Sequence, residues 1–216
     1  MVNRKQNNWF VLAPSIGICL FILLYTIATF FYPGGSDIDK TAVGFSWVHN
    51  YWCELLAEQS PNSQVNTARP IAISAMVVLV ISLSLFWFYA SRLFRFNSFG
   101  KAVILYTGVG SMITTVFLST VFHDTIINIS GALGCIAIIV SLIALYKMRA
   151  YKLFYLGIFC LVLCIINNYI YHTGHFFSQL AVIQKITFFF FLLWFCCVDI
   201  LLYRQVVKVE SRNFIS

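Results

Sequence analysis

The feature that most constrains this chain is a series of apolar runs, each long enough to cross a membrane. A transmembrane helix needs about 20 mostly apolar residues to span a hydrocarbon core about 30 Å thick. Six runs meet that length, at residues 9–31, 70–90, 102–122, 125–146, 153–171 and 180–203. They do not alternate strictly between apolar and polar residues, which favours helices over a transmembrane barrel. The sequence therefore predicts an all-α polytopic membrane protein: a six-helix bundle in a single integral domain, residues 1–216.

The composition excludes the main classes of soluble protein. Hydrophobic residues make up 61% of the 216 residues and charged residues 10%, whereas soluble proteins average about 45–50% and about 25%. A soluble fold of this size could not bury so many apolar side chains. The low charge and the 22 phenylalanines also argue against a disordered chain and a nucleic-acid-binding domain. Only Cys53 lies outside the apolar runs, so no disulfide framework is predicted.

The lysines and arginines predict an orientation, because short cytoplasmic loops are enriched in both. Eleven of the 14 flank the runs on the side that also holds the two termini, and three lie on the other side: Lys40, Arg69 and Lys185. We therefore expect a protein of the plasma (inner) membrane with both termini in the cytoplasm. The net charge of +7 is then mainly a topology signal, with some attraction to anionic lipid.

The longest segment between two runs lies on the outer side, between residues 31 and 70. It opens with a turn sequence, Tyr-Pro-Gly-Gly-Ser at 32–36. Within 44–58, apolar and aromatic residues recur at helical spacing, namely Phe45, Val48, Trp52, Leu55 and Leu56. We expect an amphipathic helix here, lying flat in the membrane interface with Asn50 and Glu54 on its polar face. In the interpretation without chemistry, this helix is a lid or an amphipathic connector.

Polar residues that could carry chemistry collect on the same outer side. All four histidines lie there, together with five of the seven acidic residues. His123 ends the third run and Asp124 opens the fourth, while His172 and His175 end the fifth. These positions are the ends of packed helices at one depth in the membrane. Ionisable groups placed so are candidates for a functional site.

The spacing of these residues predicts a zinc site. His172 and His175 would share one helix face, with Asn168 one turn below. Two imidazoles, joined by His123 or Asp124 from a neighbouring helix, match the ligands of a tetrahedral zinc with an open fourth position. Glu54 would then carry protons, and Ser119 would support the site as a hydrogen-bond donor. The candidate substrate-binding residues are Asn50, Trp52, Arg69 and Asn168. In the alternative interpretation, Asp124 caps the fourth helix and Gly174 breaks the fifth.

In chain order these candidates resemble a known pattern. They read Trp52-Cys53-Glu54, then Ser119-x-x-x-His123-Asp124, then His172-x-x-His175. This order resembles the motifs of the alkaline ceramidase and adiponectin-receptor superfamily of membrane hydrolases. The resemblance implies a zinc held by three histidines and an amidase acting on a lipid. That superfamily differs in having seven spans, a His-x-x-x-His pair and an aspartate farther from the first histidine.

A second resemblance covers more of the chain. The whole sequence is similar to uncharacterised multi-pass bacterial membrane proteins that are classified as domains of unknown function. The similarity rests on Asn50-Tyr51, Asn66-x-x-Arg69, His123-Asp124 and Gln184-Lys185. It implies a membrane protein of this general design and no particular activity.

Several functions stay open at this point. The first is a metal-dependent hydrolase that acts on a lipid amide or ester at the extracytoplasmic face. The second is a non-catalytic protein that binds lipid or a protein partner. A lipid transporter ranks lower, because coupled transporters usually place charges or broken helices at the midplane. A haem protein with His123 and His172 as axial ligands is a further variant. The oligomeric state is left open.

Overall fold

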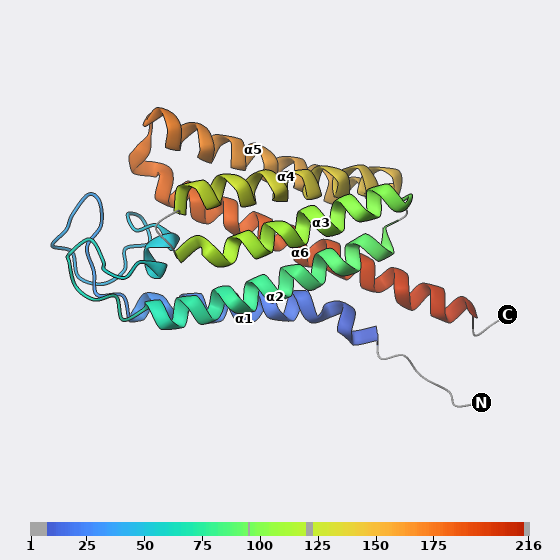
Figure 1. The fold of residues 1–216 in the computed structure, drawn as a ribbon, viewed down its shortest axis with the longest axis horizontal. Coiled ribbons are helices and arrows are strands. Elements are labelled where there is room, and N and C mark those ends of the chain that lie inside the picture. The colour runs from blue at the N-terminus through green and yellow to red at the C-terminus, as the bar shows by residue number, and fades with distance from the viewer. Residues whose placement is uncertain (1–7, 95, 120–122, 214–216) are drawn as a thin grey trace.

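The computed structural model is a bundle of six α-helices, shown in Figure 1. It describes the backbone of residues 8–94, 96–119 and 123–213, and the side chains of that part apart from residues 8, 118–119, 123–124 and 209–213. The helices are α1 (Ala13–Phe30), α2 (Arg69–Leu93), α3 (Ser98–Thr115), α4 (His123–Lys147), α5 (Tyr151–Thr173) and α6 (Phe177–Asn213). Three short 3-10 helices are η1 (Asn8–Leu12), η2 (Trp52–Leu56) and η3 (Val116–Ser119). The predicted all-α class is confirmed.

Five of the helical segments are long and apolar enough to cross a membrane. They are Trp9–Phe30, Arg69–Leu93, Thr125–Lys147, Tyr151–Thr173 and Phe177–Lys208. The remaining helix, α3, matches α1 in length, at 18 residues. It is less apolar, because it carries Lys101 and several glycine, serine and threonine residues. It nevertheless runs alongside α2 and α4 and packs against both.

The two ends of the bundle differ in what they carry. In Figure 1 both chain termini lie at one end, which we call the terminal end, and residues 31–68 lie at the other. We call residues 31–68 the cap, and that end of the bundle the cap end. At 37 residues and 1.5 Å per residue, α6 is about 55 Å long. It therefore exceeds the thickness of a membrane core and extends beyond the other helices at the terminal end.

Local sequence signals account for several helix boundaries. Pro70 occupies the first turn of α2, where a missing backbone N–H costs nothing. The side chain of Asn97 accepts a hydrogen bond from the Gly100 amide at 3.0 Å and so caps the start of α3. At the end of α5, Gly174 has a φ of 72°, in the left-handed region that glycine enters most easily. These ends therefore follow from ordinary capping rules.

The core relies on glycines that let large side chains approach a neighbouring helix. A β-carbon on Gly108 of α3 would lie 2.4 Å from the ring of Trp87 on α2. One on Gly157 of α5 would lie 2.5 Å from Leu142 on α4 and 2.7 Å from Trp194 on α6. Small residues at membrane-helix contacts allow this close packing. Gly157 is thus the point where α4, α5 and α6 meet.

The buried carboxylate of Asp199 joins the first helix to the last. Its Oδ2 accepts hydrogen bonds from the amide of Ser15 at 3.2 Å and from the Ser15 hydroxyl at 2.6 Å. Leu12, at the start of α1, offers no side-chain cap. The free amides of a helix start attract an acceptor, so α6 supplies the cap that the sequence near α1 lacks. Within the described part of the chain, Oδ1 of Asp199 has no hydrogen-bond partner.

The amphipathic helix expected over residues 44–58 is not formed. A turn at residues 47–49, bends and irregular backbone occupy most of that range, and the five-residue helix η2 is its only helical segment. The side chain of Asn50 accepts a hydrogen bond from the Ser46 amide at 2.7 Å, which closes a turn where the helix was predicted. Asn50 is also 1% exposed, so it lies inside the cap rather than on a solvent face.

Candidate functional site

The cap is held on the bundle by Trp52, which packs between α1 and α6. Its ring lies 5.3 Å from that of Tyr25 and 5.2 Å from that of Phe188, centroid to centroid. The hydroxyl of Tyr25 donates a hydrogen bond to the Trp52 carbonyl at 3.0 Å. We predicted Trp52 as a substrate-binding residue; in the structure its ring is part of the packing that holds the cap in place.

Two neighbouring residues of α6 hold the same stretch of the cap. The amide of Trp52 donates to Oε1 of Gln184 at 3.2 Å. The ammonium of Lys185 donates to the Asn50 carbonyl at 2.5 Å and to the Ala181 carbonyl at 2.8 Å. The contacts of Gln184 with Trp52 and of Lys185 with Asn50 join residues more than 130 positions apart in the chain. They fix the cap against α6 independently of its connections to α1 and α2.

Glu54 lies at the centre of a hydrogen-bonded network inside the cap. Its Oε2 accepts from the Asn50 amide group at 2.6 Å and from the Tyr32 hydroxyl at 3.0 Å. Its Oε1 accepts from the Tyr51 backbone amide at 3.1 Å. The Asn50 amide group donates in addition to the Gly35 carbonyl at 2.6 Å. The network joins the start of the cap to η2.

The burial of this network changes how its groups hold protons. Burial raises the pKa of Glu54 above that of an ordinary carboxyl group, against the hydrogen bonds from Asn50, Tyr51 and Tyr32, which lower it. Burial and the nearby Glu54 carboxylate also raise the pKa of Tyr32. A carboxyl group of this kind can carry a proton. Both of its oxygens, however, are already engaged within the cap.

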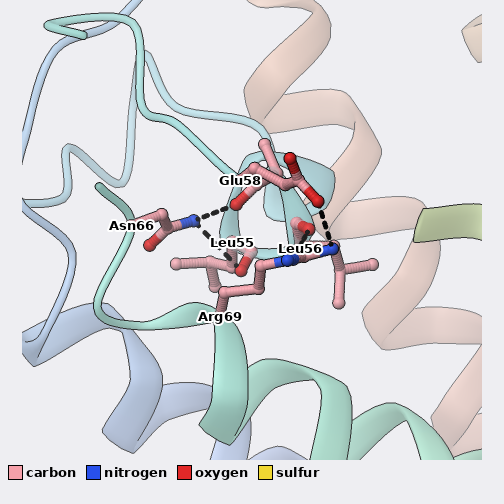
Figure 2. Close-up of polar contacts among 6 residues, drawn as sticks. Leu55, Leu56, Glu58, Asn66 and Arg69 are labelled. Atoms are coloured by element: carbon pink, nitrogen blue, oxygen red, sulfur yellow. Dashed lines mark hydrogen bonds and ion pairs between the residues drawn. The ribbon is translucent and has the colours of Figure 1, made fainter. Parts of the chain in front are cut away.

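Asn66 clamps the second half of the cap, as Figure 2 shows. Its side-chain amide donates to the carbonyls of Glu54, Leu55 and Ala57 at 3.0, 3.2 and 3.0 Å. Its Oδ1 accepts from the Ala68 amide at 3.1 Å. Asn66 is buried, so water does not reach this region. Its one side chain supplies hydrogen-bond partners to four backbone groups there.

Arg69 pairs with the cap rather than projecting freely. Its Nε donates to the Leu56 carbonyl at 3.1 Å, and its guanidinium forms an ion pair with Glu58 at 3.2 Å (Figure 2). We predicted Arg69 as a substrate-binding residue. Glu58 is the acidic partner that the structure provides. Asn50, Trp52 and Arg69 therefore all serve in holding the cap together or in place.

The predicted metal ligands are only partly covered by the structure. α5 ends at Thr173, so His175 lies beyond the Gly174 turn and does not share a helix face with His172. Both histidines are exposed. The side chains of Ser119, His123 and Asp124 lie outside the described part, although the backbone places His123 at the start of α4. Among the described residues, no group of three His, Cys, Asp or Glu side chains could hold a metal ion.

The outer parts of α4 and α5 are unusually exposed. The thiols of Cys135 and Cys164 lie close to each other, so the two helices are in contact at that level. Towards the cap end, Gly131 has no atom of another element within 4 Å of where its β-carbon would lie. In the most apolar window of α5, 17% of the residues are buried, against 28–39% in the other four spans. In Figure 1, α5 diverges from α4 towards this end.

This exposed region carries polar residues. We call it the open face: residues 125–132 of α4 and 165–173 of α5. Asn128, Asn168 and His172 are exposed there, next to apolar residues such as Ile165, which is 68% exposed. Asn168 forms no hydrogen bond with any residue that the structure describes, whereas the adjacent Asn167 donates to Thr187 on α6. Of the predicted substrate-binding residues, Asn168 is thus the one that stays available.

Comparisons with known proteins do not assign the chain to a family. No protein-family model, curated protein or solved structure matches it. The resemblances drawn from short motifs in the sequence therefore stay predictions.

Sequence reasoning missed three residues that position the cap: Tyr32, Gln184 and Lys185. Lys185 entered the prediction as an outer positive charge and, with Gln184, as part of a resemblance, and neither residue was given a role. The available signal was a Gln-Lys pair about two turns into an apolar span, where polar side chains need partners. Tyr32 had no comparable signal, because an aromatic residue at the end of a span is an ordinary interfacial anchor.

Proposed function

We propose that this protein is a six-span membrane protein that binds a lipid at its cap end, with the headgroup at the open face of α4 and α5. The observation that carries the proposal is the exposure of Asn168 and His172 on the least buried span. A polar side chain facing hydrocarbon is costly unless it finds a partner. A lipid headgroup supplies that partner, and the exposed isoleucines beside it suit an acyl chain.

The topology completes this proposal. We count α3 as a span, because it runs the length of the bundle between α2 and α4. Most lysines and arginines of the described part belong to the terminal end, so the positive-inside rule places that end in the cytoplasm. The cap and the open face then belong to the extracytoplasmic side. The lipid would come from the outer leaflet of the plasma membrane.

The proposal is tested by labelling the protein with a phospholipid that carries a photoactivatable group beside its headgroup. In reconstituted vesicles, Asn168→Leu is expected to lower the labelling yield about threefold, the equivalent of one intramembrane hydrogen bond. Tyr155→Leu is the matched control, because Tyr155 is exposed on the same helix near the terminal end. Unchanged labelling of Asn168→Leu, or an equal loss in Tyr155→Leu, would contradict the proposal.

Lipid hydrolysis is the second candidate function. It is favoured by Glu54, a half-buried carboxyl group of raised pKa at the cap end, and by the start of α4 at that same end, which holds His123 and Asp124. Zinc bound by His123, Asp124 and His172 or His175 would activate a water for attack on an amide or ester. Metal analysis of the purified protein should then find about one zinc per chain, lost in the joint variant His123→Ala and His172→Ala. If the purified protein contains no zinc but is still labelled by the photoactivatable lipid, hydrolysis is contradicted and lipid binding remains.

A further inference from the structure

A groove of a size that suits a lipid lies at the terminal end of the bundle, far from the cap. It is a groove of about 550 Å³ between the start of α3 and the end of α4. The residues that line it are Phe96, Asn97, Phe99, Gly100, Val103, Val140, Ile143 and Lys147. Binding pockets for small ligands fall in this range of size. The groove is separate from the open face, which belongs to the other end of α4.

The groove is apolar along its length and basic at its mouth. Val103, Val140 and Ile143 lie farther from the terminal end along their helices, whereas Lys147 belongs to the last turn of α4. Seven residues separate Val140 from Lys147, which corresponds to about 10 Å along the helix. The ammonium of Lys147 lies 5.6 Å from the centre of the Phe96 ring. This cation–π contact holds the charge over the groove.

The charges around the mouth select the class of ligand. Lys101, Arg149 and Lys152 are exposed at the same end. Among the side chains that the structure describes, no exposed carboxylate lies at that end, since Asp199 is buried. A cluster of basic residues beside an apolar groove between membrane helices favours a ligand with an anionic headgroup and an acyl chain. A zwitterionic phospholipid carries its own cation beside the phosphate, so a basic cluster attracts it less than a lipid of net negative charge.

We propose that this groove between α3 and α4 binds an anionic phospholipid of the leaflet at the terminal end. The phosphate contacts Lys147, and one acyl chain lies along Val103, Val140 and Ile143. The aromatic ring of Phe99, which is 75% exposed, covers the acyl chain near the headgroup. This site does not depend on the function proposed for the cap end, because no residue is shared between the two.

The test compares phosphatidylglycerol with phosphatidylcholine of identical acyl chains, by native mass spectrometry of the purified full chain in detergent. We expect tighter binding of phosphatidylglycerol, weakened about fivefold by Lys147→Gln, since one lysine near a membrane surface contributes about that factor. Lys152→Gln is the matched control: it removes the same charge at the same end from a residue that does not line the groove. It should lower the affinity less than Lys147→Gln does, because Lys152 attracts the headgroup only from outside the groove.

A second pair of variants tests the groove itself. Ile143→Trp fills it from α4 and should also lower the affinity for phosphatidylglycerol. Ile139→Trp adds the same bulk one turn away, at an exposed position outside the groove, and should not. If Lys147→Gln and Lys152→Gln lose equal affinity for phosphatidylglycerol, the proposal is overturned in favour of non-specific electrostatic attraction to the basic end. Equal binding of the two lipids, or displacement of phosphatidylglycerol by inorganic phosphate at equal concentration, would overturn it as well.

Discussion

Replacing Asn66 by leucine is expected to destabilise the cap by about 3 kcal/mol. The substitution removes the donor for the carbonyls of Glu54, Leu55 and Ala57 and the acceptor for the Ala68 amide. A buried group that loses its partner costs about 1–3 kcal/mol. Leucine restores none of these hydrogen bonds, although its volume is similar. The loss of stability should therefore be large and confined to the cap.

Hydrogen exchange measures this effect directly. The Ala68 amide of Asn66→Leu should exchange about 100-fold faster than in the wild type, since every 1.4 kcal/mol is a factor of ten. Asn168→Leu is the control, because Asn168 is exposed and unbonded within the described chain. Its exchange and unfolding free energy should stay within about 0.5 kcal/mol of the wild type. Wild-type protection of Ala68 in Asn66→Leu would contradict the role given to Asn66.

A second large effect is expected from leucine at Gly157. The added side chain would collide with Leu142 of α4 and Trp194 of α6. Trp194 cannot easily move, because its indole donates to the Leu153 carbonyl at 3.0 Å and the residue is fully buried. Overpacking a core costs about 1–3 kcal/mol and sometimes more. We expect about 3 kcal/mol at this three-helix contact.

The same substitution at Gly131 provides the contrast. Gly131 belongs to the open face, with open space where a β-carbon would lie. A β-carbon there meets no neighbour within 4 Å, and leucine has a better helix propensity than glycine. Gly131→Leu should therefore be as stable as the wild type, or up to about 1 kcal/mol more stable. Denaturant titration in detergent checks both variants, and equal destabilisation of the two would mean that α4 and α5 stay packed up to the cap end.

Much of the fold could be predicted from the sequence, because membrane spans are set by length and hydropathy. The five spans recognised in the structure correspond to predicted runs, with ends that differ by a few residues. Lysines such as Lys147 and Lys208 end up inside helices that were predicted to stop earlier. The reason is that a helix can continue past the apolar core into the interface, where long basic side chains reach water.

The cap could not be predicted, because its structure depends on long-range partners. The helical spacing of Phe45, Trp52 and Leu56 indicated an amphipathic helix. The same residues are placed instead by contacts with α1 and α6, such as that between Trp52 and Gln184. Local periodicity contains no information about such partners. Asn50 was likewise predicted on the polar face of that helix. It can be buried because Ser46, Gly35 and Glu54 provide hydrogen-bond partners for its side-chain amide.

The candidate site stays a prediction, and several residues that were given roles there make contacts within the protein. Asn50, Trp52 and Arg69 hold the cap, and Glu54 is enclosed by hydrogen bonds. Among the predicted residues whose side chains the structure describes, Asn168, His172 and His175 are exposed. The difference could not be seen in the sequence, because a polar residue near a helix end looks the same whether its partner is another part of the chain or a ligand.

The most direct test of lipid binding at the cap end is a map of where a phospholipid labels the protein. The protein is reconstituted with a phospholipid that is photoactivatable beside its headgroup, and the labelled peptides are identified by mass spectrometry. Our account predicts label concentrated on residues 125–132 and 165–173. The comparison is the end of α1 at the cap end, where Phe30 is apolar and also exposed. Label spread evenly over α1, α4 and α5 would contradict a lipid site at the open face.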